Sequence, residues 1–283
     1  MAENHNQRAM CQFAGQHMVD GMTATYDPTA LPSPAATAPH AAAVRARGLS
    51  RVFGQGEAAV HALRDVDVDF AAGEFTAIMG PSGSGKSTLL YLLAGLETQT
   101  AGHVELAGQT LTSLSDNELT ILRRDRVGFV FQSFNLLPMF TAKENILLPA
   151  QLAGRKADPK WFDTIITTLG LGGRLDHRPS ELSGGQAQRV AIARAMIMRP
   201  EVIFADEPTG NLDSRSGLEV LGFLRHSVRQ LGQTVVMVTH DPVAAAHASR
   251  VVLLADGRLA GEICDPTPES ILASLDALRP AAL

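Results

Sequence analysis

The sequence predicts an α/β fold with a mainly parallel sheet, an antiparallel β subdomain and an inserted α-helical subdomain. The first observation is that continuous apolar runs, which are typical of strands buried on both faces, alternate with helix-like segments. These runs lie at residues 75–79, 127–131, 202–205 and 234–239. The alternation favours parallel pairing, because a helix is needed to return the chain to the same edge of a sheet.

The second observation is a period of two in hydrophobicity, which is typical of a strand with one buried face. Val66, Val68 and Phe70 alternate with three aspartates. Residues 102–109 and 251–263 each have the pattern of a hairpin. A small antiparallel sheet is therefore expected beside the first apolar run.

The third observation is a block at residues 135–190, in which helical periodicity is broken by loops and which we interpret as an inserted helical subdomain. Helices are expected at residues 115–124, 142–152, 161–169, 214–231 and 268–278. Residues 1–43, rich in alanine, proline, threonine and histidine, predict a disordered N-terminal extension. The folded domain is then expected over residues 44–270, with residues 271–283 as a C-terminal tail.

A glycine-rich loop lies between the apolar run 75–79 and a helix-like segment, in the order strand, loop, helix. It matches the G-x-x-x-x-G-K-S pattern with Gly80, Pro81, Ser82, Gly83, Ser84, Gly85, Lys86, Ser87 and Thr88. Glycines allow a tight turn, so successive backbone N–H groups face one anion. The expected ligand is a nucleoside triphosphate, with Lys86 along its β- and γ-phosphates and Ser87 ligating the Mg²⁺ that bridges them.

Two carboxylates directly follow the apolar run 202–205, at the position where α/β sheets place their ligands. Asp206 is expected to bind Mg²⁺, directly or through water. Glu207 is expected to point the other way along the pleat of the strand, as the base that accepts a proton from the attacking water. A solvated loop would also carry acidic residues, but the neighbouring phosphate loop favours the catalytic interpretation.

A second glycine-rich sequence, L-S-G-G-Q at residues 182–186, opens an apolar helix-like segment. Ser183, Gly184, Gly185 and Gln186 therefore lie at a helix start, where backbone N–H groups can hold another anion. At average composition, chance would produce this pentapeptide in only about 3 of 10,000 chains of this length.

These three sequences follow one another in the order found in the ATP-binding cassette (ABC) ATPase family, which the chain resembles over residues 44–263. Gln132 resembles the glutamine of that family that senses Mg²⁺ and the transporter. The sequence N-L-D, which ends at Asp213, resembles the loop of that family that crosses to a second subunit. His240 falls at the position of the family's switch histidine, near the γ-phosphate. Phe53 lies where the family has a tyrosine that stacks on adenine, and a phenyl ring keeps the stacking face.

The resemblance implies a P-loop NTPase core that hydrolyses ATP with Mg²⁺, using Glu207, His240, Gln132 and Lys86. It also implies a dimer, because in this family the L-S-G-G-Q sequence of one subunit covers the ATP on the phosphate loop of the other. Ser183 and Gly185 would then act on the nucleotide of a second copy. One phosphate loop and one L-S-G-G-Q sequence agree with a symmetric homodimer, and a heterodimer stays open.

The leading functional prediction is the ATPase subunit of a transport complex, held at the cytoplasmic face of the membrane by separate permease chains that dock on the helical subdomain. Residues 128–138 and 208–213 resemble the subgroup that serves macrolide export and lipoprotein release, although related machines that import or sense peptides share them. No stretch of 18 or more uncharged apolar residues predicts a membrane span within the chain itself.

The alternative is a cassette ATPase that acts on nucleic acid or ribosomes. Such a partner is not expected, because the net charge is -5, with 24 basic against 29 acidic residues, and no long basic run is present. The chain also has no second cassette, zinc module or long coiled coil. An inactive cassette is disfavoured, because Lys86, Asp206, Glu207 and His240 are all present.

Overall fold

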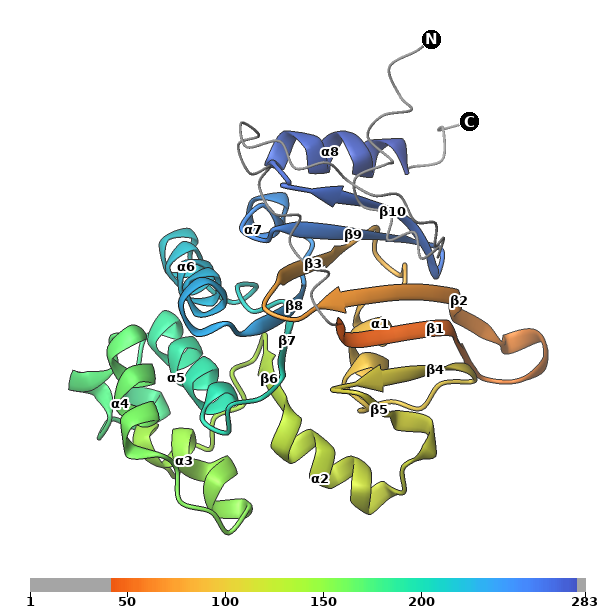
Figure 1. The fold of residues 1–283 in the computed structure, drawn as a ribbon. Helices are drawn as coiled ribbons and strands as arrows, with labels where there is room; N and C mark the ends of the chain where they lie inside the picture. Colours follow the sequence, from red (N-terminus) through yellow and green to blue (C-terminus); the bar gives the residue numbers. More distant parts are fainter. Residues whose placement is uncertain (1–41, 279–283) are drawn as a thin grey trace, which may run out of the picture. The chain divides into compact units, whose positions relative to one another are not determined.

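A computed structural model of the protein describes residues 42–278. These residues fold around a six-stranded sheet with the order β10–β9–β3–β8–β7–β6 (Figure 1). Its strands are β3 (Phe75–Met79), β6 (Val127–Phe131), β7 (Val202–Asp206), β8 (Thr234–Val238), β9 (Arg250–Ala255) and β10 (Arg258–Cys264). Neighbouring strands are parallel except for β9 and β10, which form the antiparallel hairpin that the sequence predicts.

A second, antiparallel sheet has the order β2–β1–β4–β5. Its strands are β1 (Ala42–Phe53), β2 (Val60–Ala71), β4 (Ala101–Leu106) and β5 (Gln109–Thr110). Strand β1 has no clear sequence pattern, because its pairing register shifts around Gly48, which has a φ of +57°. The predicted disordered extension lies outside the described residues except for Ala42 and Ala43, for which the prediction is wrong, since they begin β1.

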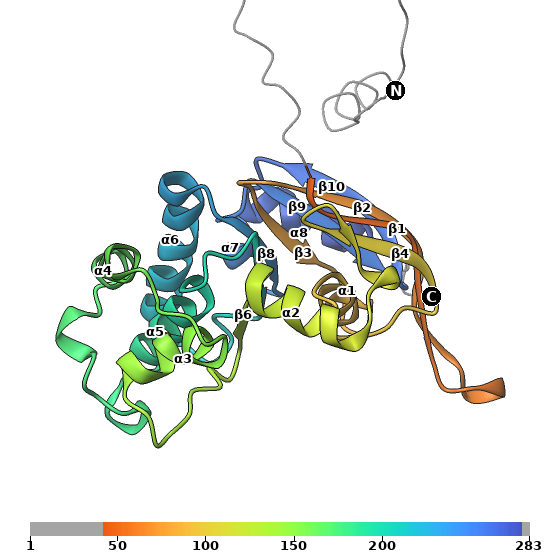
Figure 2. The ribbon, with the colours of Figure 1, turned by 60° about the horizontal axis from the view of Figure 1, so that its bottom comes forward.

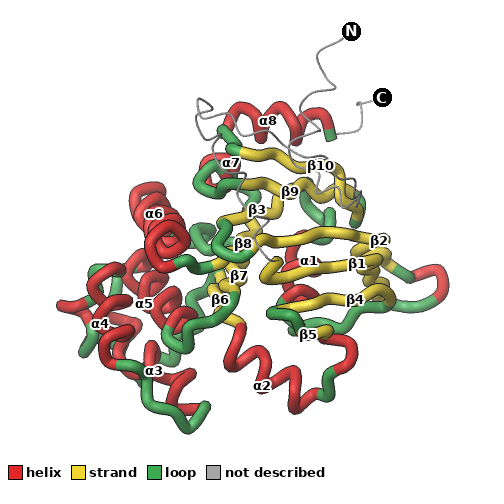
Figure 3. Tube along the Cα trace, in the orientation of Figure 1, coloured by secondary structure: helices red, strands yellow, loops and turns green. Residues whose placement is uncertain are grey.

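The helices are α1 (Lys86–Leu93), α2 (Asp116–Arg126), α3 (Ala142–Leu152), α4 (Pro159–Thr168), α5 (Gly184–Met196), α6 (Ser214–Leu231), α7 (Pro242–Ala245) and α8 (Pro268–Ala277). Helices α3, α4 and α5 lie together (Figure 3). Helices α3 and α4 lie within residues 135–190, the block that we interpret as the helical subdomain, whereas α5 begins in this block and extends beyond it. The bounds of α3 and α6 are those that the sequence predicts. Helix α7 has only one turn, which is too short to give a periodic pattern.

Alternate residues of the central strands face two hydrophobic clusters, one on each side of the six-stranded sheet. Ile78 and Phe204 pack with α1 and the antiparallel sheet. Met79 and Ile203 pack with α5, α6 and α7. Helix α1 therefore lies between the two sheets, and α5 covers the opposite face (Figure 2).

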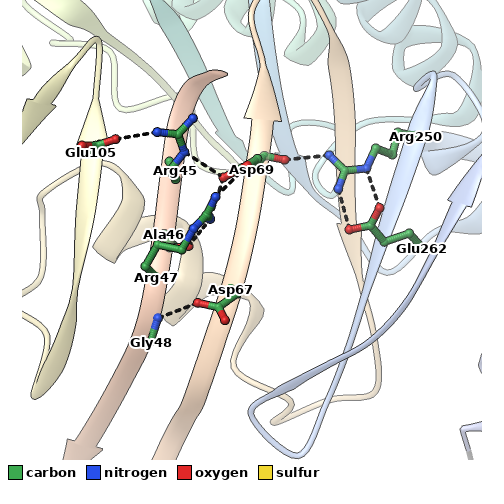
Figure 4. Close-up of polar contacts among 9 residues, drawn as sticks. All are labelled: Arg45, Ala46, Arg47, Gly48, Asp67, Asp69, Glu105, Arg250 and Glu262. Carbon is green, nitrogen blue, oxygen red and sulfur yellow. Dashed lines mark hydrogen bonds and ion pairs between the residues drawn. The ribbon is translucent and has the colours of Figure 1, made fainter. Parts of the chain in front are cut away.

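A network of charged side chains connects the antiparallel sheet to β9 and β10 (Figure 4). Arg250 donates to the backbone carbonyl of Asp69 at 2.7 Å and forms a two-point ion pair with Glu262. Burial alone would raise the pKa of Asp69, but a 2.8 Å hydrogen bond from Arg47 helps to bring this pKa below its usual value. The network holds the β1–β2 hairpin, at whose turn Phe53 lies, against the sheet that carries the phosphate loop.

Candidate functional site

The predicted site residues follow the carboxyl ends of the parallel strands. Gly80 follows β3, Gln132 follows β6 and Glu207 follows β7, while His240 comes two residues after β8. The last residues of β6, β7 and β8 pair with one another across the sheet. These side chains therefore meet at one edge, as the topology of a parallel sheet predicts.

The phosphate loop makes close backbone contacts that only glycine permits. A Cβ atom on Gly80 would lie 1.9 Å from the carbonyl oxygen of Leu254, and one on Gly85 would lie 2.3 Å from that of Ala62. Ser84 is only 3% exposed, and its Oγ has no hydrogen-bond partner. A buried hydroxyl without a partner is unfavourable, and a phosphate oxygen held by the loop would satisfy it.

Lys86 begins α1 and extends over the phosphate loop. Its Nζ donates to the backbone carbonyls of Gly80 at 3.0 Å and Pro81 at 2.8 Å. Burial lowers the pKa of Lys86, and this effect outweighs the Glu207 and Asp206 carboxylates, which raise the pKa. Because burial disfavours the charged ammonium, an anion at this position would stabilise it.

The carboxylate of Asp206 is held by two hydroxyl groups of α1. Ser87 Oγ donates to Oδ1 at 3.3 Å, and the Tyr91 hydroxyl donates to Oδ2 at 2.7 Å. A hydroxyl and a carboxylate are oxygen ligands of the kind that Mg²⁺ prefers, so Ser87 and Asp206 fit the predicted metal site. Burial, followed by the hydrogen bond to Asp206, raises the pKa of Tyr91 to about 12. Tyr91 is a site residue that the sequence did not reveal, because nothing in an apolar helix marks it as a partner of a distant aspartate.

Glu207 and His240 lie side by side, with 3.1 Å between Glu207 Oε1 and His240 Nδ1. The pocket beside them is lined by Glu207, Thr209, Gly210, Thr239, His240 and Asp241. The prediction that the pleat directs Glu207 is wrong, because β7 ends at Asp206 and Glu207 has a φ of +46°. Non-glycine residues seldom adopt this left-handed conformation, and those that do are concentrated at functional sites. A 2.9 Å hydrogen bond from the Glu207 amide to the Val238 carbonyl fixes the turn.

Gln132 contacts the N-L-D loop that follows β7. Its Nε2 donates to Asn211 Oδ1 at 3.3 Å, and Asn211 Nδ2 donates to the Gln132 carbonyl at 3.1 Å. Asp213 caps α6 by accepting a hydrogen bond from the Ser216 amide at 3.0 Å, and this bond lowers the pKa of Asp213. Gln132 thus lies beside the loop with which the family resemblance associates Asp213.

The L-S-G-G-Q sequence forms the N-terminus of α5, on the side of the six-stranded sheet opposite to α1. Ser183 and Gln186 form a capping box, in which each side chain accepts a hydrogen bond from the backbone of the other. A Cβ atom on Gly185 would lie 2.9 Å from Cβ of Ser216, so this glycine allows α5 and α6 to pack closely. Ser183 and Gly184 are exposed, and within residues 42–278 no hydrogen bond joins them to the phosphate loop.

Phe53 ends β1 with 38% of its surface exposed. The guanidinium of Arg51 lies 4.5 Å from the centre of the ring, and Arg51 also pairs with Glu97 at 2.8 Å. Phe53 pairs with Val60 of β2, and Ala62 of the same strand lies against Gly85 of the phosphate loop. An exposed aromatic ring on the strand that pairs with β2 fits the predicted stacking on a base.

The sequence model of the family described as "ABC transporter" matches residues 63–210, which is more than half of the chain. The chain belongs to the ABC transporter family. This cassette is 46% identical over 235 residues to the macrolide export ATP-binding/permease protein MacB of Marinobacter nauticus, covering 82% of the chain and 36% of MacB. It is also 46% identical over 218 residues to an uncharacterized ABC transporter ATP-binding protein of Methanocaldococcus jannaschii, covering 76% of the chain and 97% of that relative. The chain thus spans about a third of the length of the MacB relative.

Solved structures of ABC cassettes have the same fold. A dimeric post-hydrolysis state of an ATP-binding cassette, bound to ADP and Pi, aligns with a TM-score of 0.71 and 40% identity, covering 78% of this chain and 98% of that one. A second dimeric structure, of a bacterial ABC transporter cassette, gives the same values. This cassette therefore has the P-loop NTPase fold that the sequence predicts. None of the helices described between residues 42 and 278 has the length and hydropathy needed to span a membrane.

Proposed function

We propose that this cassette binds ATP with Mg²⁺ on the phosphate loop and hydrolyses it to drive transport across a membrane. The observation that carries the proposal is that Lys86, Ser87, Asp206, Glu207 and His240 meet at one edge of the sheet. An anion-binding loop next to a carboxylate-bearing strand end is suited to phosphoryl transfer to water.

The phosphate loop supplies most of the binding. Its backbone N–H groups and the start of α1 hold the phosphates, and the Lys86 ammonium exchanges the carbonyls of Gly80 and Pro81 for phosphate oxygens. Ser87 and Asp206 would hold Mg²⁺, with Gln132 as a further candidate ligand, and the ion would neutralise charge on the phosphates. Within the described residues no cluster of three or more His, Cys, Asp and Glu side chains could hold a metal, so nucleotide and water would complete the ligand set.

Glu207 is the base of the proposed reaction. It accepts the proton of the water that attacks the γ-phosphorus, since Glu207 lines the pocket at the end of β7. The bond between this phosphorus and the bridging oxygen breaks, so that ADP and phosphate are released. His240, 3.1 Å away, orients this carboxylate, and its exposed ring is available to the γ-phosphate. Phe53 stacks on the base at the other end of the nucleotide.

We infer that the active unit is a dimer of two copies. In one chain α1, which follows the phosphate loop, and α5, which begins with the L-S-G-G-Q sequence, pack on opposite faces of the six-stranded sheet. The exposed Ser183 and Gly184 at the N-terminus of α5 can instead contact the phosphates of an ATP held by the partner. Gly185, which the family resemblance also places in that contact, is buried against Ser216 in one chain. The dimeric state of both solved cassettes supports this arrangement.

The cassette would act on a separate permease at the cytoplasmic face of the membrane, exporting or extracting a macrolide, lipoprotein or peptide-like substrate. The name of the MacB relative supports export, and the Methanocaldococcus relative corresponds almost entirely to the cassette. None of the relatives reported above is named for action on nucleic acids or ribosomes, so no observation favours that alternative. Co-purification with a multi-span membrane protein tests this part of the proposal.

The catalytic assignment is tested by Glu207→Gln, with phosphate release, ATP binding and size-exclusion chromatography as measurements. Phosphate release should fall about 100-fold or more, because a general base contributes 10²–10⁴-fold. ATP binding should persist, and ATP-bound dimers should accumulate. Glu201→Gln is the matched control, because Glu201 pairs with Arg126 away from the site. Normal hydrolysis by Glu207→Gln would remove Glu207 from its role.

A further inference from the structure

Helix α5 carries a fully buried polar side chain, Gln188, among apolar residues. Its Nε2 donates to the backbone carbonyl of Pro208 at 2.7 Å and to that of Phe131 at 3.4 Å. Its Oε1 is buried without a hydrogen-bond partner, which is unfavourable. A methionine would fill a similar volume without this cost, so packing alone does not account for a glutamine here.

The two carbonyl groups lie next to the catalytic side chains, one at the end of β6 and one in the loop after β7. Phe131 immediately precedes Gln132, and Pro208 immediately follows Glu207. Because the amide nitrogen of Gln188 has two hydrogens, it can hold the end of β6 and the loop after β7 at once. A displacement of α5 is therefore transmitted to both segments through one side chain.

The other end of this connection is the exposed N-terminus of α5. Gln188 lies five residues after Ser183, or about 7.5 Å along a helix that rises 1.5 Å per residue. A short stretch of helix moves as one rigid element, so a nucleotide that fixes Ser183 also fixes Gln188. The L-S-G-G-Q sequence and the catalytic loops of one chain are thus linked through α5.

We propose that Gln188 is a positioning residue that couples the nucleotide bound at the L-S-G-G-Q sequence to Glu207 and Gln132 of the same chain. This inference rests on the proposed dimer, in which that nucleotide is held by the phosphate loop of the partner. Each Gln188 then makes hydrolysis in one site depend on occupancy of the other. The expected consequence is cooperative hydrolysis.

The test compares wild type, Gln188→Met and Ile192→Val by the ATPase rate as a function of ATP concentration. Gln188→Met removes the donor and keeps the side-chain length, while Ile192→Val loses core packing at a buried position of the same helix. The wild type should show a Hill coefficient above 1. Gln188→Met should lower kcat about tenfold, the effect of losing about 1.4 kcal/mol of hydrogen bonding, and bring the Hill coefficient to about 1. Binding of a fluorescent ATP analogue should stay unchanged.

Gln188→Glu provides a second readout, which depends on pH. A neutral carboxyl can donate to the Pro208 carbonyl, whereas a carboxylate repels it, so the activity of this variant relative to wild type should rise as the pH falls. Wild-type kcat and Hill coefficient in Gln188→Met, or an equal loss in Ile192→Val, would overturn the inference. Normal hydrolysis by Glu207→Gln would overturn the proposed function itself, so the two failures are distinguishable.

Discussion

Replacing Tyr91 by phenylalanine tests how the Asp206 carboxylate is held for Mg²⁺. The change removes the hydroxyl that donates to Asp206 Oδ2 at 2.7 Å and leaves Ser87 Oγ at 3.3 Å from Oδ1. The ring keeps its contact with Phe129, whose centre is 6.0 Å away. The perturbation is therefore limited to one hydrogen bond, without which the carboxylate can rotate away from Ser87.

The size of the effect follows from this single bond. A hydrogen bond to a charged group contributes about 1.5–3 kcal/mol. Tyr91 is partly exposed, so water replaces some of the lost interaction, and the lower end of this range applies. Since 1.4 kcal/mol is a factor of ten, the Mg²⁺ concentration for half-maximal hydrolysis should rise about tenfold, within the 10–100-fold range for groups that orient metal ligands.

The assay is phosphate release titrated with Mg²⁺ at constant ATP, together with Mn²⁺ binding measured by electron paramagnetic resonance with a non-hydrolysable nucleotide. Phe129→Leu is the matched control, because it alters the packing beside Tyr91 and keeps the hydroxyl. This control should lower the unfolding temperature and leave the metal requirement unchanged. A wild-type Mg²⁺ requirement and Mn²⁺ affinity in Tyr91→Phe would show that the Tyr91 hydroxyl does not hold Asp206 for the metal.

Three further predictions concern the phosphate loop, the stacking of Phe53 on the adenine base, and the titration of Tyr91. Gly85→Ala should abolish binding of a fluorescent ATP analogue, because its Cβ would lie 2.3 Å from the Ala62 carbonyl oxygen and the residue has a φ of +97°; near-normal affinity would contradict the loop geometry. Phe53→Leu should weaken ATP binding about fivefold, or about 1 kcal/mol of stacking, and leave tripolyphosphate binding unchanged in calorimetry. Equal losses for both ligands would exclude stacking. The tyrosinate absorbance of Tyr91, taken as wild type minus Tyr91→Phe, should develop near pH 12, because the pKa of Tyr91 is raised to about 12. Since the ordinary pKa of tyrosine is about 10, the protonated Tyr91 hydroxyl contributes fully to stability below pH 10, and this contribution is lost as the pH rises toward 12. A difference spectrum centred near pH 10 would contradict the burial of this hydroxyl.

The strands beside the site were predictable from the sequence, because a parallel strand covered on both faces needs a continuous apolar run. Strands β3 and β6 begin and end at the predicted residues. Once these strands are parallel, the residues after them must meet at one edge of the sheet. The pairing of Ser87 with Asp206 and of Glu207 with His240 follows from this topology.

Contacts between distant residues were not predictable from local pattern. Tyr91 is 115 positions from its partner Asp206, and no period or motif connects the two. The positive φ of Glu207 depends on a hydrogen bond to β8, which the pleat of β7 cannot indicate. Gln188 could have been found from the sequence, because it is a polar residue on the apolar stripe of α5. Ala191 and Ile192, three and four positions later, lie on the same stripe.

The six-stranded sheet separates the two halves of the site, and this limits how they can communicate. The strand interiors between α1 and α5 are fully buried, and a close-packed core resists displacement. Communication is easier at the edge of the sheet, where Gln188 reaches from α5 to the carbonyls of Phe131 and Pro208. Hydrogen bonds suit this task, because they are directional and can rearrange without opening a cavity. A Gln188→Met chain should therefore still bind ATP, but its hydrolysis should no longer respond to the partner.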